Sequence, residues 1–312
     1  MPPVRSLRLS PARAKRLRPR LERFLTRAPN RLRVGFDPVQ FPRRYPLRED
    51  AEVAGLLAAS LAYGRVAGFV PKVEQLLLGM GNHPGAFVRG LDVGGARRLL
   101  RGFVYRFNLG TDVGVLLLGA GRLLRERGSL EPWVAEPLAS GLSLHEALTH
   151  LARALRDVPL GPLVKALGPA RGLQHLLPVP LGGGAAKRLN MFLRWMVRGP
   201  DEVDLGLWRH ISTSSLVIPL DTHIGRIARR LGLTARRDLS WRTALEITSN
   251  LRRVDAADPV RFDFALCHHG MSGVCSPRAR AEACLSCELR SVCLVGSRLA
   301  PTGRSRPGVR PA

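Results

Sequence analysis

The stretch LGGGAAKRLNMFLRWMV, residues 181–197, carries the clearest folding signal in this chain. Three glycines make a turn, and the apolar repeat that follows them places Leu189, Phe192 and Met196 on one face of a helix. The pattern predicts a glycine-rich turn that opens a buried helix over residues 185–197.

The same helical periodicity continues outward from this stretch in both directions. The chain has no run of alternating apolar and polar residues of the kind that is typical of strands. Ser143 with Glu146 forms a capping box, and Ser240 and Asp258 stand where N-caps are expected. The sequence therefore predicts an all-α protein with short loops. Further helices are expected over residues 51–63, 113–126, 147–156, 241–253 and 259–269.

The distribution of charge, proline and glycine divides the chain into four parts. Residues 1–30 are expected to form a flexible basic arm, with a short helix around residues 17–25 as the alternative for part of it, and residues 298–312 a disordered basic tail. Between them we expect a helical domain over 31–200, with its core over about 50–200, that ends in the glycine turn and the helix after it. A second helical domain over 201–297 contains the cysteines. We expect a cleft between the two domains.

The composition is strongly basic. Lys and Arg number 49 against 24 Asp and Glu, which gives a formal net charge of +25. A surface of this sign attracts a polyanion, and nucleic acid is the usual one. An arginine-rich bias of the whole proteome is the alternative interpretation. Residues 1–30 alone hold nine basic side chains and one acid, so this segment either contacts a phosphate backbone or is a solvated tail.

Two classes of protein do not fit the apolar pattern. No apolar run reaches the roughly 18 residues that a membrane span requires, and the N-terminus lacks the apolar core of a secretion signal. We therefore expect a cytoplasmic protein without membrane partners, associated with the nucleoid when it binds DNA. We expect a monomer, although nothing in the sequence determines the oligomeric state.

Lysine is rare among the basic residues. Only Lys15, Lys72, Lys165 and Lys187 are present, and every other basic residue is arginine. Arginine stays protonated, whereas a lysine with a lowered pKa can attack carbon and form an imine. The lysines are therefore candidates for chemistry that arginine cannot perform.

Four of the five cysteines form a compact pattern near the C-terminus. Cys275, Cys284, Cys287 and Cys293 are spaced C-x8-C-x2-C-x5-C, and Cys267 precedes them on an expected helix. Without a secretion signal, this pattern favours metal binding over disulfides. One C-x2-C pair with two outlying thiols suits a [4Fe–4S] cluster, in which each iron takes one thiolate. A zinc site and a thiol group without metal are the alternatives, and Cys267 is interpreted as a core thiol.

Candidate phosphate contacts lie in two places. The cysteine loop carries Arg278 and Arg280, which a metal cluster would hold in one position. The backbone amides of Gly182, Gly183 and Gly184 stand at the start of a helix, where an anion can approach closely. Glycine turns are common, so a purely structural turn is the alternative.

The segment PLDTHIGRIARRL, residues 219–231, places Asp221 where a helix begins. An Asp at such a position is most often an N-cap. Considered together with Lys187 and the cysteines, it has a second interpretation.

The order of these motifs resembles that of endonuclease III and the helix-hairpin-helix (HhH-GPD) superfamily of DNA glycosylases. That superfamily runs from a hairpin through a lysine, Asp-Thr-His and His-Gly to four cysteines. Here Lys187, residues 221–223, residues 269–270 and the cysteine pattern of 275–293 stand in the same order. The resemblance covers residues 50–295 in outline. The KRLNMFLRWMVR segment and the Phe-Asp-Pro segment upstream also resemble a bacterial family of unassigned function.

The resemblance to the glycosylases implies a two-domain HhH-GPD-like fold and base-excision repair of duplex DNA that carries a damaged base. It implies that Lys187, with a lowered pKa, attacks the sugar C1′ and forms a Schiff base, and that Asp221 stabilises the cationic transition state. Strand cleavage by β-elimination would follow, and the four cysteines would hold a [4Fe–4S] cluster. The residues expected to contact DNA are Gly182, Gly183, Gly184, Arg188, His223, Arg226, Arg278 and Arg280.

The hairpin departs from the pattern of the superfamily. It reads Leu-Gly-Gly-Gly-Ala here, in place of Leu-Pro-Gly-x-Gly. A non-catalytic Fe–S nucleic-acid-binding protein derived from the same fold is therefore the alternative function. Tyr105, Phe107 and Asn108 either belong to the core or line a pocket in which a flipped base stacks.

Overall fold

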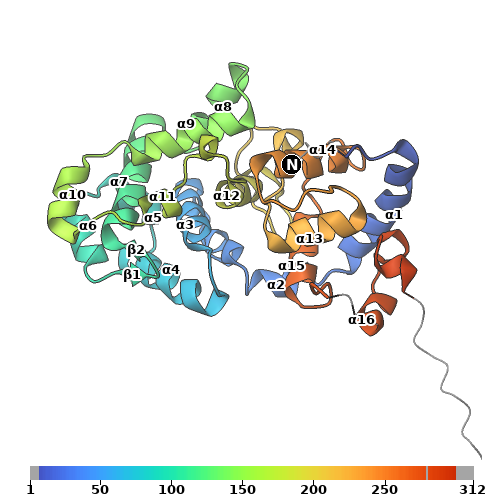
Figure 1. Ribbon diagram of the computed structural model, residues 1–312. Helices are drawn as coiled ribbons and strands as arrows, with labels where there is room; N and C mark the ends of the chain where they lie inside the picture. Colours follow the sequence, from blue (N-terminus) through green and yellow to red (C-terminus); the bar gives the residue numbers. More distant parts are fainter. Residues whose placement is uncertain (1–6, 279, 300–312) are drawn as a thin grey trace, which may run out of the picture.

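The structure is a computed structural model that describes residues 7–278 and 280–299. Helices make up 62% of it and strands 2%, which confirms the all-α prediction (Figure 1). The strands are β1 (Val104–Tyr105) and β2 (Asn108–Leu109), which pair in an antiparallel hairpin. The α-helices are α1 (Pro11–Arg27), α2 (Asn30–Val34), α3 (Arg48–Leu61), α4 (Val66–Met80), α5 (Pro84–Arg89), α6 (Val93–Leu100), α7 (Gly110–Arg127), α8 (Pro132–Ala139), α9 (Leu144–Arg156), α10 (Leu160–Leu167), α11 (Leu173–Leu176), α12 (Lys187–Val197), α13 (Thr222–Leu231), α14 (Trp241–Arg252), α15 (Asp263–Met271) and α16 (Ala281–Leu285).

The helices form two lobes on either side of α12 (Figure 1). One lobe contains α3 to α11, and the other contains α1, α2 and α13 to α16. Leu189, Phe192 and Met196 are at most 4% exposed, so the apolar face predicted for α12 is buried. The helix begins two residues later than predicted, because Ala186 takes a left-handed φ of 47° and cannot continue it. α12 packs on α3, where the lack of a side chain at Gly55 makes room for Met196.

The flexible arm predicted over residues 1–30 is wrong for its described part, and the short helix considered around residues 17–25 lies within a longer helix. Residues 11–27 form α1, which packs on the second lobe with Leu17 and Leu21 fully buried. The Leu9 N–H also donates to Asn250 Oδ1 at 2.7 Å. Apolar residues at helical spacing lie between the basic residues. Their burial against the second lobe stabilises the helix while most basic side chains stay in water. Most basic side chains of α1 remain exposed, whereas Arg13 is half-buried and donates to the carbonyl oxygens of Leu231 and Val292.

Several predicted helix boundaries differ from the structure, and the largest difference is at the start of α15. The helix expected from Pro259 begins four residues later, at the start of α15. Asp258 does not cap it, because its carboxylate accepts a hydrogen bond from Arg198 Nε at 2.8 Å. The N-caps predicted for α9 and α14 do form, including the capping box of α9.

Most of the tail predicted over residues 298–312 lies outside the described residues. The described helices include none that is both long enough and apolar enough to cross a lipid bilayer.

Two glycines allow α7 to lie unusually close to its neighbours. A Cβ added at Gly119 would lie 2.0 Å from the carbonyl oxygen of Leu155 in α9. One added at Gly121 would lie 1.9 Å from the carbonyl oxygen of Val88 in α5. Neither distance permits a side chain, so these glycines allow the close approach of α7 to α9 and α5.

We expect Gly121→Ala to destabilise the protein by about 3 kcal/mol, because the backbone of α5 or α7 must move to admit the methyl group. The midpoint of thermal or urea unfolding measures the effect. Gly161→Ala in α10 is the matched control, since no atom lies within 4 Å of its added Cβ. That change should be neutral or stabilise by about 0.5–1 kcal/mol. Equal midpoints for the two variants would contradict the described packing of α5 on α7.

Candidate functional site

Lys187 and Asp221 meet between the lobes. Lys187 is the first residue of α12 and Asp221 is the N-cap of α13, and Lys187 Nζ lies 3.1 Å from Asp221 Oδ2. Asp221 Oδ1 accepts hydrogen bonds from the backbone N–H groups of His223 and Ile224, both at 2.9 Å. The Lys187 side chain is 34% exposed and that of Asp221 is 16% exposed. Asp221 is therefore both a helix cap and the partner of a lysine that solvent can reach.

The pKa of Lys187 is raised, in contrast to the lowered pKa that the resemblance implied. Burial acts to lower it, but the carboxylate of Asp221 outweighs the effect of burial. Burial likewise acts to raise the pKa of Asp221, while the Lys187 ammonium and a helix amide hold it below its ordinary value. The two groups therefore rest as an ion pair, and Lys187 becomes a nucleophilic amine only after it gives up a proton.

Lys187 lines a cavity of about 110 Å³ whose walls come from both lobes. The loop after α2, the residues between α3 and α4, and the helices α12 and α15 all contribute to it. Its ionisable side chains are Asp37, Lys187, Arg194, Asp263, Cys267 and His268. The cavity thus combines an amine, carboxylates, a thiol and an imidazole.

The interpretation of Cys267 as a core thiol describes only part of its role. Its Sγ lies 3.7 Å from Asp221 Oδ2 and donates to that oxygen. Burial and the carboxylates of Asp221 and Asp263 raise the pKa of Cys267 well above its ordinary value. The group therefore remains a neutral thiol that donates to the same Asp221 oxygen that Lys187 contacts.

The structure also brings together Asp37 and His268, which the sequence did not single out as a site. His268 Nε2 lies 3.0 Å from Asp37 Oδ2. Asp37 precedes Pro38 in a pattern typical of an N-cap, and His268 follows Cys267 on α15. No local pattern could have paired two residues so far apart along the chain.

The glycine turn is open to solvent. Gly182, Gly183 and Gly184 are all exposed, and no atom lies within 4 Å of a Cβ added at any of them. Gly183 has φ of +95°, which favours glycine, and Gly184 forms an isolated bridge with Ser240. The Gly182 and Gly183 N–H groups donate to the carbonyl oxygens of Val179 and Pro180, both at 3.0 Å, so the prediction that these two amides bind an anion is corrected.

Two arginines predicted to contact DNA are instead engaged within the protein. Arg188 donates to the carbonyl oxygens of Ser60 and His175, and burial lowers its pKa to about 10. Arg226 donates to the carbonyl oxygen of Cys275 at 2.8 Å and to that of Gly270 at 3.0 Å. Both predictions are corrected, because these guanidinium groups donate their hydrogen bonds to backbone carbonyl oxygens of the protein.

His223, the third such residue on these helices, is half-buried, and its Nδ1 lies 3.1 Å from Arg226 Nη2. A Cβ added at Gly270 would lie 2.8 Å from the His223 Cβ, so the two helices α13 and α15 touch there. His223 therefore packs between α13 and α15. Arg278 and Arg280 of the cysteine loop are exposed, as a phosphate contact requires.

The four cysteines of the C-terminal pattern lie near one another. Burial raises the pKa of Cys287, and the other three cysteines raise it further by their charge. Arg230 Nη1 donates to Cys275 Sγ at 3.0 Å, and the Gly296 N–H donates to Cys293 Sγ at 3.2 Å. Such N–H donors around sulfur are typical of the surroundings of thiolate ligands.

In the part of the chain that the structure describes, no three His, Cys, Asp or Glu side chains are grouped so as to hold a single metal ion. A cubane differs from a single ion, because each thiolate binds a different iron. Cys275, Cys284, Cys287 and Cys293 are the residues that would hold such a cluster.

A group of aromatic side chains lies where α3 ends. Tyr63 packs on Tyr105, Phe107 and His175, with ring centroids 4.4–5.6 Å apart. Tyr105 and Asn108 are buried, whereas Phe107 is 47% exposed and stacks on Tyr63. Tyr105 and Asn108 therefore belong to the core. Of these three residues, only Phe107 has an exposed ring on which a base could stack.

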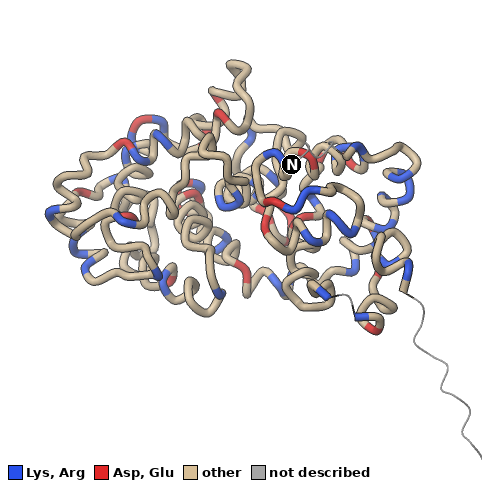
Figure 2. The backbone as a smooth tube through the Cα atoms, in the orientation of Figure 1, with Lys and Arg blue, Asp and Glu red and all other residues tan. Residues whose placement is uncertain are grey.

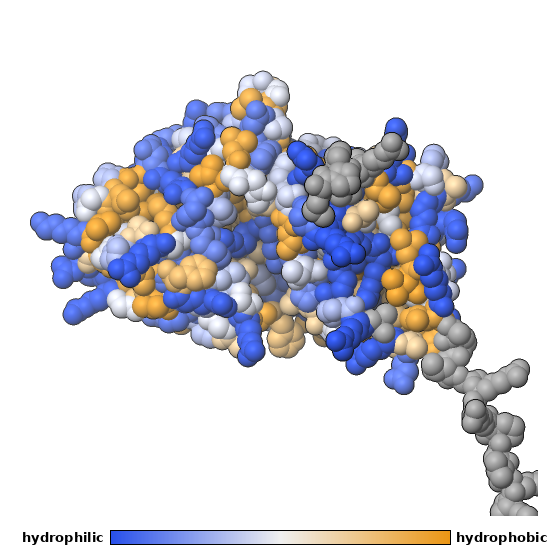
Figure 3. Space-filling view, in the orientation of Figure 1, coloured by the Kyte–Doolittle hydropathy of each residue, from blue (hydrophilic) through white to orange (hydrophobic). Residues whose placement is uncertain are grey.

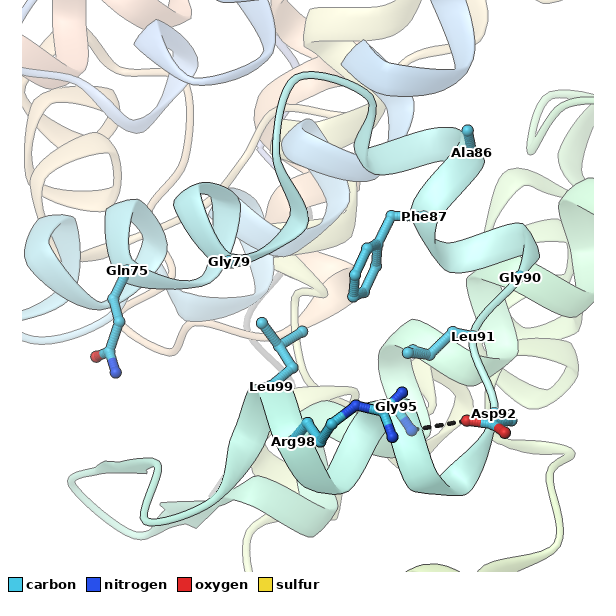
Figure 4. Close-up of a pocket in the computed structure, with 10 residues that line it drawn as sticks. All are labelled: Gln75, Gly79, Ala86, Phe87, Gly90, Leu91, Asp92, Gly95, Arg98 and Leu99. Atoms are coloured by element: carbon cyan, nitrogen blue, oxygen red, sulfur yellow. Dashed lines mark hydrogen bonds between the residues drawn. The ribbon is translucent and has the colours of Figure 1, made fainter.

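A larger cavity of about 600 Å³ lies within the first lobe, between α4, α5 and α6 (Figure 4). Its charged side chains are Asp92 and Arg98, and Asp92 is engaged as the N-cap of α6 through the Gly95 N–H at 2.6 Å. Phe87, Leu91 and Leu99 point into it (Figure 4). It contains no pairing of nucleophile and base, so we place the candidate site at Lys187.

Comparison with known proteins gives one match. A family model described as a protein of unknown function (DUF2400) matches residues 37–272. No curated protein and no solved structure matches the chain. The matched residues include Asp37, Lys187, Asp221 and His268, and they end before the four clustered cysteines. Because the match spans most of its length, the chain belongs to the DUF2400 family of proteins of unknown function.

Proposed function

We propose that the protein is a base-excision repair DNA glycosylase with AP-lyase activity, in which Lys187 forms a Schiff base with a deoxyribose. One observation carries the proposal: an amine and a carboxylate lie 3.1 Å apart, and the amine lines a cavity between two lobes. Attack on a sugar carbon requires a nucleophile and an anion that stabilises the developing positive charge. Lys187 and Asp221 supply these two groups.

In the proposed reaction, Asp221 first takes one proton from the Lys187 ammonium. Lys187 Nζ then bonds to the sugar C1′ while the bond from C1′ to the base breaks, and the electron pair of that bond leaves with the base. The attached nitrogen loses a proton, and its lone pair displaces the ring oxygen O4′, which takes up a proton. The resulting Schiff base permits β-elimination of the 3′ phosphate. The base must leave the helical stack for C1′ to reach Lys187.

The charge distribution supports DNA as the substrate. Lys and Arg lie on both lobes and outnumber Asp and Glu (Figure 2). The face that contains α13 and α15 is broadly hydrophilic (Figure 3). The exposed side chains of Arg278 and Arg280 would contact phosphate.

Borohydride trapping tests the proposal. The protein is incubated with a duplex that contains one abasic site, in the presence of borohydride, which reduces an imine to a stable amine. We expect a covalent protein–DNA adduct on a denaturing gel, and none with the same duplex lacking the abasic site. Binding to the abasic duplex without any adduct would exclude Schiff-base chemistry.

A second candidate function is a non-catalytic nucleic-acid-binding protein. The resting ion pair favours it, because the raised pKa of Lys187 keeps the amine protonated. This function predicts binding that weakens steeply with salt, with log K falling by about 0.9 per neutralised phosphate for each log unit of salt. It also predicts no adduct, so the trapping experiment separates the two functions.

We further propose that Cys275, Cys284, Cys287 and Cys293 hold a [4Fe–4S] cluster. The thiols lie near one another, and N–H groups of Arg230 and Gly296 donate to two of the sulfurs. When bound, the cluster would hold the cysteine loop, with Arg278 and Arg280, in one conformation. Its role would be structural, and no step of the proposed reaction passes through it.

We expect protein purified without oxygen to be coloured and to contain about four irons per chain. Replacing Cys284 and Cys287 together by serine should remove the iron and the visible absorption, because two ligands are lost. Cys267→Ala is the matched control and should keep both. Colourless protein that contains one zinc per chain would contradict the proposed cluster.

A further inference from the structure

We propose that His268, positioned by Asp37, is the general acid that protonates the departing base. This inference rests on the proposed function, because a base departs only if Lys187 and Asp221 cleave its bond to the sugar. His268 and Asp37 both line the cavity that Lys187 lines. They form a second acid–base pair in that cavity, and the steps assigned to Lys187 do not use it.

The contacts of the imidazole leave one nitrogen for a ligand. His268 Nε2 donates to Asp37 Oδ2 at 3.0 Å, and these side chains are only 10% and 16% exposed. Asp37 is held in turn, because its Oδ1 accepts the Val39 N–H at 3.0 Å where η1 (Pro38–Gln40) begins. The Phe264 ring lies 4.3 Å from the imidazole, measured between ring centroids. The ring is thus fixed with Nε2 toward Asp37, and Nδ1 is the nitrogen that can exchange a proton with a ligand.

The other ionisable groups of the cavity are either paired with an opposite charge or keep their proton. Lys187 is paired with Asp221, and the Cys267 thiol keeps its proton. Arg194 donates to Asp263 and to Asp204. Burial raises the pKa of Asp263 to about 6, but its carboxylate is held by the Arg194 guanidinium. Imidazole is the one side chain here whose ordinary pKa lies close to neutrality, which a proton donor requires. His268 is therefore the best-suited acid in the cavity.

The proton balance is simple. When the bond from C1′ to the base breaks, its electron pair stays on a ring nitrogen of the base. The His268 imidazolium supplies one proton from Nδ1 to the base and becomes neutral. Its Nε2 keeps its proton and continues to donate a hydrogen bond to Asp37. The proton that Lys187 lost stays on Asp221, and solvent later returns a proton to His268.

An abasic site separates this role from that of Lys187, because it has no base to protonate. We would compare wild type, His268→Gln, Asp37→Asn and Asp37→Glu. The DNA duplexes would carry an abasic site, one neutral lesion (8-oxoguanine, hypoxanthine or dihydrothymine), or 7-methylguanine. The 7-methylguanine nucleotide is already cationic, so its base leaves neutral without a proton.

We expect His268→Gln to reduce release of the neutral base about 100-fold or more, with trapping at the abasic site within about threefold of wild type. Release of 7-methylguanine should fall much less. Asp37→Asn should follow the same pattern more weakly, and Asp37→Glu should restore part of the release of the neutral base because it restores the carboxylate.

Three outcomes would overturn the inference. Equal losses on all duplexes would make His268 a structural residue, and unchanged release of the neutral base would remove it from the reaction. Release of no base by the wild type, with trapping at the abasic site intact, would leave a lyase that has no use for the acid. Failure of the wild type to form any adduct would instead overturn the proposed function, so the two failures are distinguishable.

Discussion

Replacing Lys187 by alanine is expected to abolish the covalent adduct that the wild type forms with an abasic duplex under borohydride. The adduct requires an amine that reaches the sugar carbon, and Lys187 Nζ is the amine that lines the cavity beside Asp221. Arginine cannot replace it, because a guanidinium keeps its proton. Lys187→Arg should therefore fail as completely as Lys187→Ala, although it preserves the positive charge.

The matched control for this variant is Lys165→Ala. Lys165 is an exposed lysine on α10, so its loss removes the same charge from a surface that the site does not use. It should form the adduct at the rate of the wild type, and all proteins should bind the duplex with similar affinity. Equal adduct formation by Lys187→Ala and wild type would exclude Lys187 as the nucleophile.

The second large effect is expected at Arg194, where Arg194→Met should destabilise the fold by about 3–5 kcal/mol. Arg194 is only 3% exposed and donates from Nη1 to Asp263 and from Nε to Asp204 Oδ1, at 3.2 Å for the latter. Asp204 is fully buried and Asp263 nearly so. Methionine fills a similar volume but leaves two buried carboxylates without this partner, which is far more costly than the loss of one hydrogen bond.

The destabilisation should depend on pH in a defined direction. Burial raises the pKa of Asp263 to about 6 even with Arg194 beside it. A carboxyl whose pKa is higher in the folded state stabilises the fold while protonated, so its contribution is lost as the pH rises through that value. Removing Arg194 raises the pKa of Asp263 further. The stability deficit of Arg194→Met should therefore shrink as the pH is lowered from about 8 to about 5.

Urea unfolding at each pH measures this effect, with Arg153→Met as the control. Arg153 is an exposed arginine on α9, and its loss should change stability by no more than about 0.5 kcal/mol. Similar midpoints for the two variants would show that the Arg194 network is not the buried charge centre described above.

Local signals predicted much of the helical framework and missed what depends on distant contacts. The apolar face of α12 and the caps at Ser143 and Ser240 follow from interactions within one or two turns, so the sequence alone placed them well. Only the central part of α1 was considered helical, because its basic residues are conspicuous and the lobe that its apolar residues pack against lies mostly after residue 200. Asp258 was misjudged because Arg198 competes for its carboxylate from another element.

The candidate site divides in the same way. The sequence alone determined that a lysine follows the glycine turn, that an Asp precedes a helix, and that four cysteines share a loop, because these are matters of spacing along the chain. Only the tertiary structure decided that Lys187 meets Asp221, that the pKa of this lysine is raised rather than lowered, and that His268 pairs with Asp37. The reason is physical: burial and charge act through space, and both depend on which distant segments the folded chain brings together.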